Sequence, residues 1–117
     1  MKVLLVDDEE DLVTAMAERL SYRDIDADWA VDCDQAMDLM KQNPYDVAVL
    51  DVKMPNLSGI ELKKELEKIR PETRYIFLTG HGSDDDFRAG AAEASRYLAK
   101  PLDLEILIRT MEEVLTS

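Results

Sequence analysis

The sequence predicts an α/β domain built on a doubly wound, five-stranded parallel sheet with five helices covering its faces. Two observations lead to this prediction. Five short apolar runs of strand length alternate with stretches whose apolar residues recur at helical spacing. The first and third runs are apolar throughout, which is typical of parallel strands buried on both faces. Because each connection between parallel strands needs a crossover, the helical stretches are expected to cover both faces of the sheet.

Each predicted strand is a short run bounded by polar or turn-forming residues. The central one, Val47–Leu50, is too short for a helix and rich in β-branched residues. The run Ala27–Val31 is partly polar, which suits a less buried strand, and we interpret Trp29 within it as an ordinary packing residue. The five predicted strands are Val3–Val6, Ala27–Val31, Val47–Leu50, Tyr75–Leu78 and Arg96–Ala99.

The predicted helices alternate with these strands and carry start and stop signals. Asn43-Pro44 ends the second helix and Pro71 follows the third, because proline disfavours a helical residue before it. Ser83 can cap a fourth helix that opens with Asp84–Asp86, where acidic side chains suit the helix dipole. The predicted helical stretches are 11–22, 32–43, 60–69, one that opens at 84–86, and 104–115. The expected buried stripe of the last one is Leu104, Leu107, Ile108, Met111 and Leu115.

Length and composition limit the possible functions. The 117 residues suit one domain, which we expect to span residues 1–117. The 26 acidic against 14 basic residues give a net charge of -12, which repels nucleic acids and anionic membranes. Cys33 is the only cysteine, so an internal disulfide is excluded and a reducing compartment fits; we interpret it as a packing residue. The first apolar run is too short for a signal peptide or a membrane span, so we expect a soluble, cytoplasmic protein.

Polar residues stand at the carboxyl ends of four predicted strands. Asp7 and Asp8 follow the first strand, Asp51 the third, Thr79 the fourth and Lys100 the fifth. Open α/β sheets bind their ligands at this edge. Each residue has an ordinary explanation by itself, as a helix-dipole charge, a loop cap, a strand former or a solvated end. Their coincidence at one edge indicates a functional site.

This set of residues suits phosphoryl transfer onto a carboxylate. Asp51 would be the nucleophile, because aspartyl phosphates are known covalent intermediates. Several carboxylates at the end of buried strands repel one another unless a cation shares them, and Mg²⁺ prefers such oxygen ligands; Asp7, Asp8 and Asp51 are the candidates. Lys100 would neutralise charge on the phosphoryl oxygens, and the Thr79 hydroxyl could donate a hydrogen bond to one of them.

The motifs at these strand ends make the chain resemble the receiver domain of two-component response regulators over essentially its whole length. They are Leu4-Leu5-Val6-Asp7-Asp8-Glu9, Asp51-Val52-Lys53-Met54-Pro55, Leu78-Thr79-Gly80-His81 and Tyr97-Leu98-Ala99-Lys100-Pro101. The resemblance implies a flavodoxin-like fold with strand order 2-1-3-4-5. It also implies that Asp51 accepts a phosphoryl group from a sensor histidine kinase or a phosphotransfer protein.

The resemblance implies roles for the other site residues. Mg²⁺ would be bound by Asp8, Asp51 and the backbone carbonyl of Lys53, with Asp7 acting mainly through water. Phosphoryl acceptance and self-dephosphorylation would be autocatalytic reactions of a signalling domain, so the chain is not expected to be an enzyme. A cis peptide bond is implied at Lys100-Pro101.

The resemblance also implies a conformational switch made by Thr79 and Tyr97. It would act on the face formed by the fourth helix, the last strand and the fifth helix, where a phosphorylation-dependent homodimer could form. The chain departs from the family pattern before Tyr97, where Glu93–Arg96 replaces the usual Gly-Ala. The sequence ends at Ser117, directly after the closing helix, which fits a stand-alone receiver as well as part of a longer regulator.

Two bulky side chains are candidate modulators of the dephosphorylation rate. Hydrolysis of an aspartyl phosphate needs a water in line with the phosphorus, and Lys53 and His81 are the residues best placed to flank that path. Neither side chain offers a carboxamide to orient water, so we predict slower self-dephosphorylation than in a variant that carries Lys53→Asn with His81→Ala. The alternative is that both side chains point into solvent and have no effect.

Three other functions are alternatives to phosphoryl acceptance. A phosphatase of the haloacid dehalogenase type needs a second aspartate two residues after the nucleophile, where this chain has Lys53. A nucleotide- or flavin-binding module would want a glycine-rich loop after the first strand, where Asp7–Glu10 would repel phosphate. A receiver-like interaction domain that is not phosphorylated in its normal role remains the main alternative.

Overall fold

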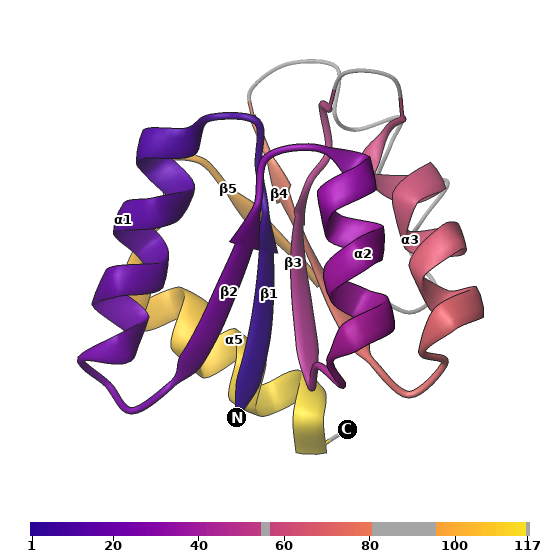
Figure 1. Cartoon of the computed structure of the whole chain (residues 1–117). Coiled ribbons are helices and arrows are strands. Elements are labelled where there is room, and N and C mark those ends of the chain that lie inside the picture. The colour runs from indigo at the N-terminus through magenta and orange to yellow at the C-terminus, as the bar shows by residue number, and fades with distance from the viewer. Residues whose placement is uncertain (55–56, 81–95, 117) are drawn as a thin grey trace.

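Five parallel strands form one sheet in the order β2-β1-β3-β4-β5, with helices packed on both faces (Figure 1). The computed structural model describes residues 1–54, 57–80 and 96–116. All four strand pairings are parallel, which confirms the predicted fold class and strand order. The carboxyl ends of the strands therefore meet at one edge of the sheet, the upper edge in Figure 1.

Each strand lies within one residue of its predicted position at either end. Their apolar character explains this accuracy, because β1, β3 and β4 are buried along nearly their whole length. The edge strands β2 and β5 are more exposed, in keeping with their polar residues. The strands are β1 (Lys2–Val6), β2 (Asp26–Ala30), β3 (Val47–Asp51), β4 (Arg74–Thr79) and β5 (Arg96–Ala99).

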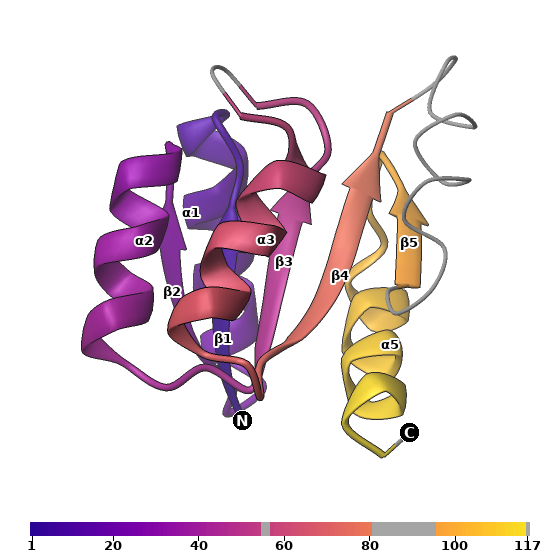
Figure 2. The same cartoon turned by 90° about the vertical axis from the view of Figure 1, so that its right-hand side faces the viewer.

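Four helices lie within the described residues, and they occupy two layers. Figure 2 shows α2 and α3 on one side of the sheet, with α1 and α5 on the other. The predicted helix that opens at Asp84–Asp86 lies outside the described residues. The four helices are α1 (Glu10–Ser21), α2 (Cys33–Gln42), α3 (Gly59–Ile69) and α5 (Leu104–Thr116).

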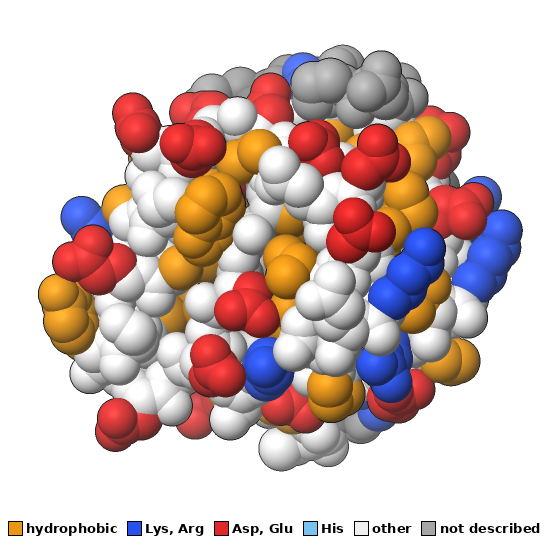
Figure 3. Space-filling view, viewed as in Figure 1, with side chains coloured by type: hydrophobic (Ala, Val, Ile, Leu, Met, Phe, Trp, Pro, Cys, Tyr) orange, Lys and Arg blue, Asp and Glu red, His pale blue; other side chains and the backbone are white. Residues whose placement is uncertain are grey.

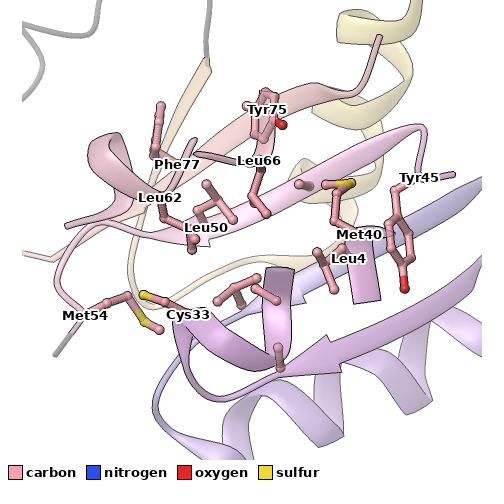
Figure 4. Close-up of a cluster of buried hydrophobic side chains, with 14 of the residues drawn as sticks. Leu4, Cys33, Met40, Tyr45, Leu50, Met54, Leu62, Leu66, Tyr75 and Phe77 are labelled. Carbon is pink, nitrogen blue, oxygen red and sulfur yellow. The ribbon is translucent and has the colours of Figure 1, made fainter. Parts of the chain in front are cut away.

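The alternation of side chains along the strands divides the core in two. Leu4 and Leu50 point toward α2 and α3, where they pack with Leu62 and Phe77 (Figure 4). Their chain neighbours point to the other face and pack against α1 and α5. Burial on both faces explains why the central strands are continuous apolar runs.

The start of α3 lies directly against the end of β3. The Ser58 hydroxyl accepts a hydrogen bond from the Glu61 N–H at 3.2 Å, and the Glu61 carboxylate reaches back to Ser58, which completes a capping box. The Gly59 N–H donates to the Val52 carbonyl oxygen at 2.9 Å. A Cβ at Gly59 would lie 2.7 Å from the Asp51 carbonyl oxygen, so any side chain there would push the backbone of Asp51. Only glycine allows this close approach.

Two details of the predicted packing were wrong. On α5, Leu115 is 38% exposed, whereas Val114 is buried; the positions that face the sheet are Leu107, Thr110, Met111 and Val114, and Leu115 falls beside that stripe. Trp29 is also 38% exposed, because it lies on the edge strand β2, whereas Cys33 is buried as predicted. Among the described residues, no helix is both long and apolar enough to cross a bilayer.

Candidate functional site

The polar residues predicted to share one edge of the sheet do so. Asp7 follows β1, Asp51 ends β3, Thr79 ends β4 and Lys100 follows β5. The register pairs Asp51 with Leu78 and Thr79 with Ala99, so the strand ends are level with one another. Figure 3 shows acidic side chains gathered along this upper edge of the molecule.

Three carboxylates form a compact cluster at this edge. Asp7, Asp8 and Asp51 each offer a carboxylate oxygen that lies within 4.8 Å of the other two. Asp7 and Asp51 are buried, at 2% and 6% exposure, whereas Asp8 is exposed. The cluster therefore opens to solvent on the side of Asp8.

The Lys100 ammonium group lies against this cluster. Its Nζ is 2.9 Å from Asp7 Oδ2 and 3.2 Å from Asp51 Oδ2, and it lies 3.7 Å from Glu9 Oε1. The Lys100 N–H donates to the Thr79 carbonyl oxygen at 2.8 Å, and the Lys100-Pro101 peptide bond is cis. The Lys100 side chain, which follows β5, thus contacts Asp7 after β1 and Asp51 at the end of β3.

Backbone groups hold the two buried carboxylates in place. Asp7 Oδ1 accepts a hydrogen bond from the Glu9 N–H at 2.9 Å, and Asp51 Oδ1 accepts one from the Lys53 N–H at 3.2 Å. In each side chain the second oxygen, Oδ2, faces Lys100. Each carboxylate is therefore oriented by a local bond and a distant one.

Burial and charge shift the acid–base equilibria of the site. Burial raises the pKa of Asp51 above its ordinary value, and the neighbouring charge of Asp7 raises it further, while Lys100 and the Lys53 N–H only partly oppose this. Burial by itself lowers the pKa of Lys100, but the bonds and charges of Asp7 and Asp51 outweigh it, so the net shift is upward. Lys100 therefore stays charged at neutral pH, and ionised Asp51 carries an electrostatic cost.

The donor set fits a divalent cation that prefers oxygen. Three carboxylates contribute a charge of -3 and Lys100 contributes +1, which leaves -2. Mg²⁺ takes carboxylate oxygens and keeps several waters, so a cluster open on one side suits it. The resemblance to receiver domains implies Mg²⁺ at these carboxylates, and the way the three are grouped suits such an ion.

The remaining predicted residues are placed as follows. Thr79 is fully buried, and the Tyr97 ring stacks on Phe77 with centroids 5.6 Å apart at 22°, its hydroxyl oxygen shielded from solvent. Tyr97 pairs with Phe77 across β4 and β5, on the same face of the sheet as Thr79. The Lys53 side chain is exposed. His81 and the departure at 93–95 lie outside the described residues.

Sequence reasoning overlooked two residues at this site. Nothing in the sequence indicates that Glu9 approaches Lys100, because the two residues lie 91 positions apart in the chain. In the sequence, Gly59 directly precedes the predicted helix 60–69 and belongs to a turn-rich stretch. Its position directly after Ser58, a capping residue, was the available signal for a close approach of helix and strand.

Comparison with known proteins places this site in a family. Residues 3–112 match the response regulator receiver domain. Response regulator MprA of Mycobacterium sp. (strain KMS) is 34% identical over 116 residues, which cover 98% of this chain and 50% of that protein. A response regulator receiver domain protein from Clostridium thermocellum has a TM-score of 0.88 at 29% identity, covering 98% of this chain and 94% of that one. The receiver domain of Francisella response regulator 1452 has a TM-score of 0.84 at 33% identity, covering 98% and 96%.

The chain belongs to the response regulator receiver domain family of two-component signalling. Receiver domains are signalling domains and not enzymes, and they interact with histidine kinases. The chain spans about half the length of its MprA relatives.

The raised pKa of Asp51 predicts how stability depends on pH and metal. Folded Asp51 holds a proton more readily than unfolded Asp51, so its ionisation destabilises the fold as pH rises above about 3.8 through the folded-state pKa. Without Mg²⁺, Asp51→Asn should therefore raise the free energy of unfolding at neutral pH, by on the order of 1 kcal/mol. The gain should vanish in acid, where Asp51 is protonated in both states. Urea denaturation across the pH range measures it.

Mg²⁺ should stabilise the wild type by mass action, and the increment should shrink in Asp51→Asn and Asp8→Ala. The matched control is Asp11→Asn, which removes an exposed charge of the same turn from outside the cluster. An equal rise in melting temperature for Asp8→Ala and Asp11→Asn would contradict the assignment of Asp8 to the cation site.

Proposed function

We propose that this domain accepts a phosphoryl group on Asp51 from a histidine kinase or phosphotransfer protein, with Mg²⁺ as cofactor, and thereby switches a partner-binding face. The observation that carries the proposal is the position of Asp51 Oδ2, which lies 3.2 Å from the Lys100 ammonium beside two further carboxylates. A nucleophilic carboxylate, a fixed cation and a cluster able to hold a divalent ion are the parts that this chemistry needs. We further propose that the domain spans residues 1–117 and acts in the cytoplasm, where Cys33, free in this structure, would remain reduced.

The proposed reaction is a displacement at phosphorus. An Asp51 carboxylate oxygen attacks, and the bond from phosphorus to the donor's imidazole nitrogen breaks. The electron pair stays on the imidazole, which takes up a proton from water. Mg²⁺, held by Asp7, Asp8, Asp51 and the Lys53 backbone carbonyl, would supply positive charge for the phosphoryl oxygens. Lys100 is positioned to pair with one of those oxygens as the charge on Asp51 is lost, and Thr79 would donate its hydroxyl to another.

The phosphoacceptor assignment predicts a covalent product. Incubation with Mg²⁺ and acetyl phosphate should add one phosphoryl group, seen by intact mass, and peptide mapping should place it on Asp51. Asp51→Asn should lose modification at that position, whereas Asp38→Asn, an exposed aspartate on α2, should be modified like the wild type. A wild type that stays unmodified would support the alternative of a receiver-like domain that is not phosphorylated in its normal role.

We propose that Thr79 and Tyr97 transmit phosphorylation to the surface. Both lie on the face of the sheet that carries Phe77, and Tyr97 packs on that ring. Movement of the Thr79 hydroxyl toward the phosphoryl group would change the space available to Tyr97, which gives the two arrangements that a switch requires. The partner could be a second phosphorylated copy of this chain.

Thr79→Ala should therefore still accept phosphate but lose phosphorylation-dependent association, measured by sedimentation velocity or by partner binding. Thr73→Ala is the matched control, because Thr73 is also buried but lies just before β4, where its hydroxyl donates to the Tyr45 carbonyl oxygen. If phosphorylation leaves association of the wild type unchanged, the coupling proposal is wrong.

We propose that Lys53 and His81 slow self-dephosphorylation by restricting the path of the attacking water. The exposed Lys53 side chain starts two residues after the acceptor. The variant Lys53→Asn with His81→Ala opens this path and supplies an amide that can orient water, so the phosphoryl group should be lost several-fold faster. The decay is followed by intact mass after the donor is removed. Lys64→Asn, an exposed lysine on α3, should decay like the wild type, and a double mutant no faster than Lys64→Asn would refute the proposal.

A further inference from the structure

A groove of about 430 Å³ lies beside the acceptor site, between α1 and the segment that joins β5 to α5. Figure 1 shows that segment passing behind α1. The volume falls within the range of small-molecule binding sites, which are usually 300 to 1,000 Å³. The proposed phosphoryl transfer uses Lys100 at its end but leaves the rest of the groove unassigned.

Apolar side chains from three parts of the chain line the groove. Leu12 and Met16 come from α1, and Leu78 comes from β4. Pro101 and Leu102 come from the segment after β5. Leu12 and Leu102 are only partly buried, so apolar surface is left that a ligand could cover.

The charged part of the groove lining lies beside the carboxylate cluster. Glu9 and Lys100 form it, and Asp7 and Asp51 lie in contact with Lys100. Lys100 is held more closely by Asp7 and Asp51, at 2.9 and 3.2 Å, than by Glu9 at 3.7 Å. The exposed Glu9 carboxylate therefore keeps charge that Lys100 does not neutralise. Four carboxylates, Asp7, Asp8, Glu9 and Asp51, against one lysine leave a local charge of -3.

We propose that this groove binds a small cationic amphiphile, with an apolar body on Leu12, Met16 and Leu102 and an ammonium group at Glu9. Charge complementarity selects the head group, because an anion would meet the surplus of carboxylates while a cation would reduce it. The apolar lining selects the body. This inference goes beyond phosphoryl acceptance and concerns the unphosphorylated domain, so its failure would leave the proposed function untouched.

The test uses three probes that share one tail and differ in charge: octylamine, octanol and octanoate. Each is titrated into the unphosphorylated chain without Mg²⁺, and amide correlation spectra locate the binding. We expect saturable shifts at Leu12, Met16 and Leu102, with octylamine binding about fivefold more tightly than octanol and octanoate more weakly than either.

Matched variants separate the groove from the general acidity of the chain. Glu9→Gln should weaken octylamine binding about three- to fivefold without changing octanol binding, whereas Asp11→Asn, an exposed acid of the same turn outside the groove, should have little effect. Leu12→Ser should weaken octylamine and octanol alike, whereas Leu115→Ser, an exposed leucine on α5, should weaken neither.

Three results would overturn the proposal: shifts that map outside the groove, octanoate binding as tight as octylamine binding, or equal effects of Glu9→Gln and Asp11→Asn. Groove resonances that shift with protein concentration alone would also overturn it, because a second copy of the chain would then be the occupant.

Discussion

The ion pairs of Lys100 with Asp7 and Asp51 are the interaction on which the site depends. Two buried carboxylates near one another are unfavourable, and burial together with the charge of Asp7 raises the pKa of Asp51. Lys100 offsets part of it by placing one ammonium within 3.2 Å of both. Because the three residues follow different strands, the same contact ties the outer strand β5 to the centre of the sheet. The same ion pairs therefore stabilise the charges of the site and hold the end of β5 near β1 and β3.

Backbone hydrogen bonds and packing fix the position of Asp51 at the end of β3. Asp51 closes β3 one residue beyond its apolar run, and the Val52 N–H continues the pairing to Leu78. Gly59 then allows α3 to begin against the carbonyl of Asp51, so the start of α3 is fixed directly beside the end of β3. The Asp51 carboxylate is held by the Lys53 N–H and by Lys100, which follows the edge strand β5. These two contacts limit the orientations open to the Asp51 side chain.

Glu9 links the two sites argued for in this molecule. Its N–H donates to Asp7, while Glu9 also lines the apolar groove and its carboxylate lies near Lys100. Part of the net charge of -12 is concentrated at this edge of the sheet, where several carboxylates surround the single Lys100 ammonium. A cation of either kind, divalent at the cluster or organic at the groove, would relieve the same repulsion.

The sequence by itself determined the strands, their order through the family resemblance, and the set of residues that meet at one edge. Apolar runs report burial on both faces, which is a local property, and parallel strands bring their carboxyl ends together by geometry. Tertiary structure alone decided which oxygen of Asp51 faces Lys100 and which faces the Lys53 N–H, and that Glu9 approaches the same lysine. It also decided that Val114 is buried while Trp29 and Leu115 are exposed. These outcomes depend on how segments distant in the chain pack together, and the periodicity of apolar residues along one segment cannot predict that packing.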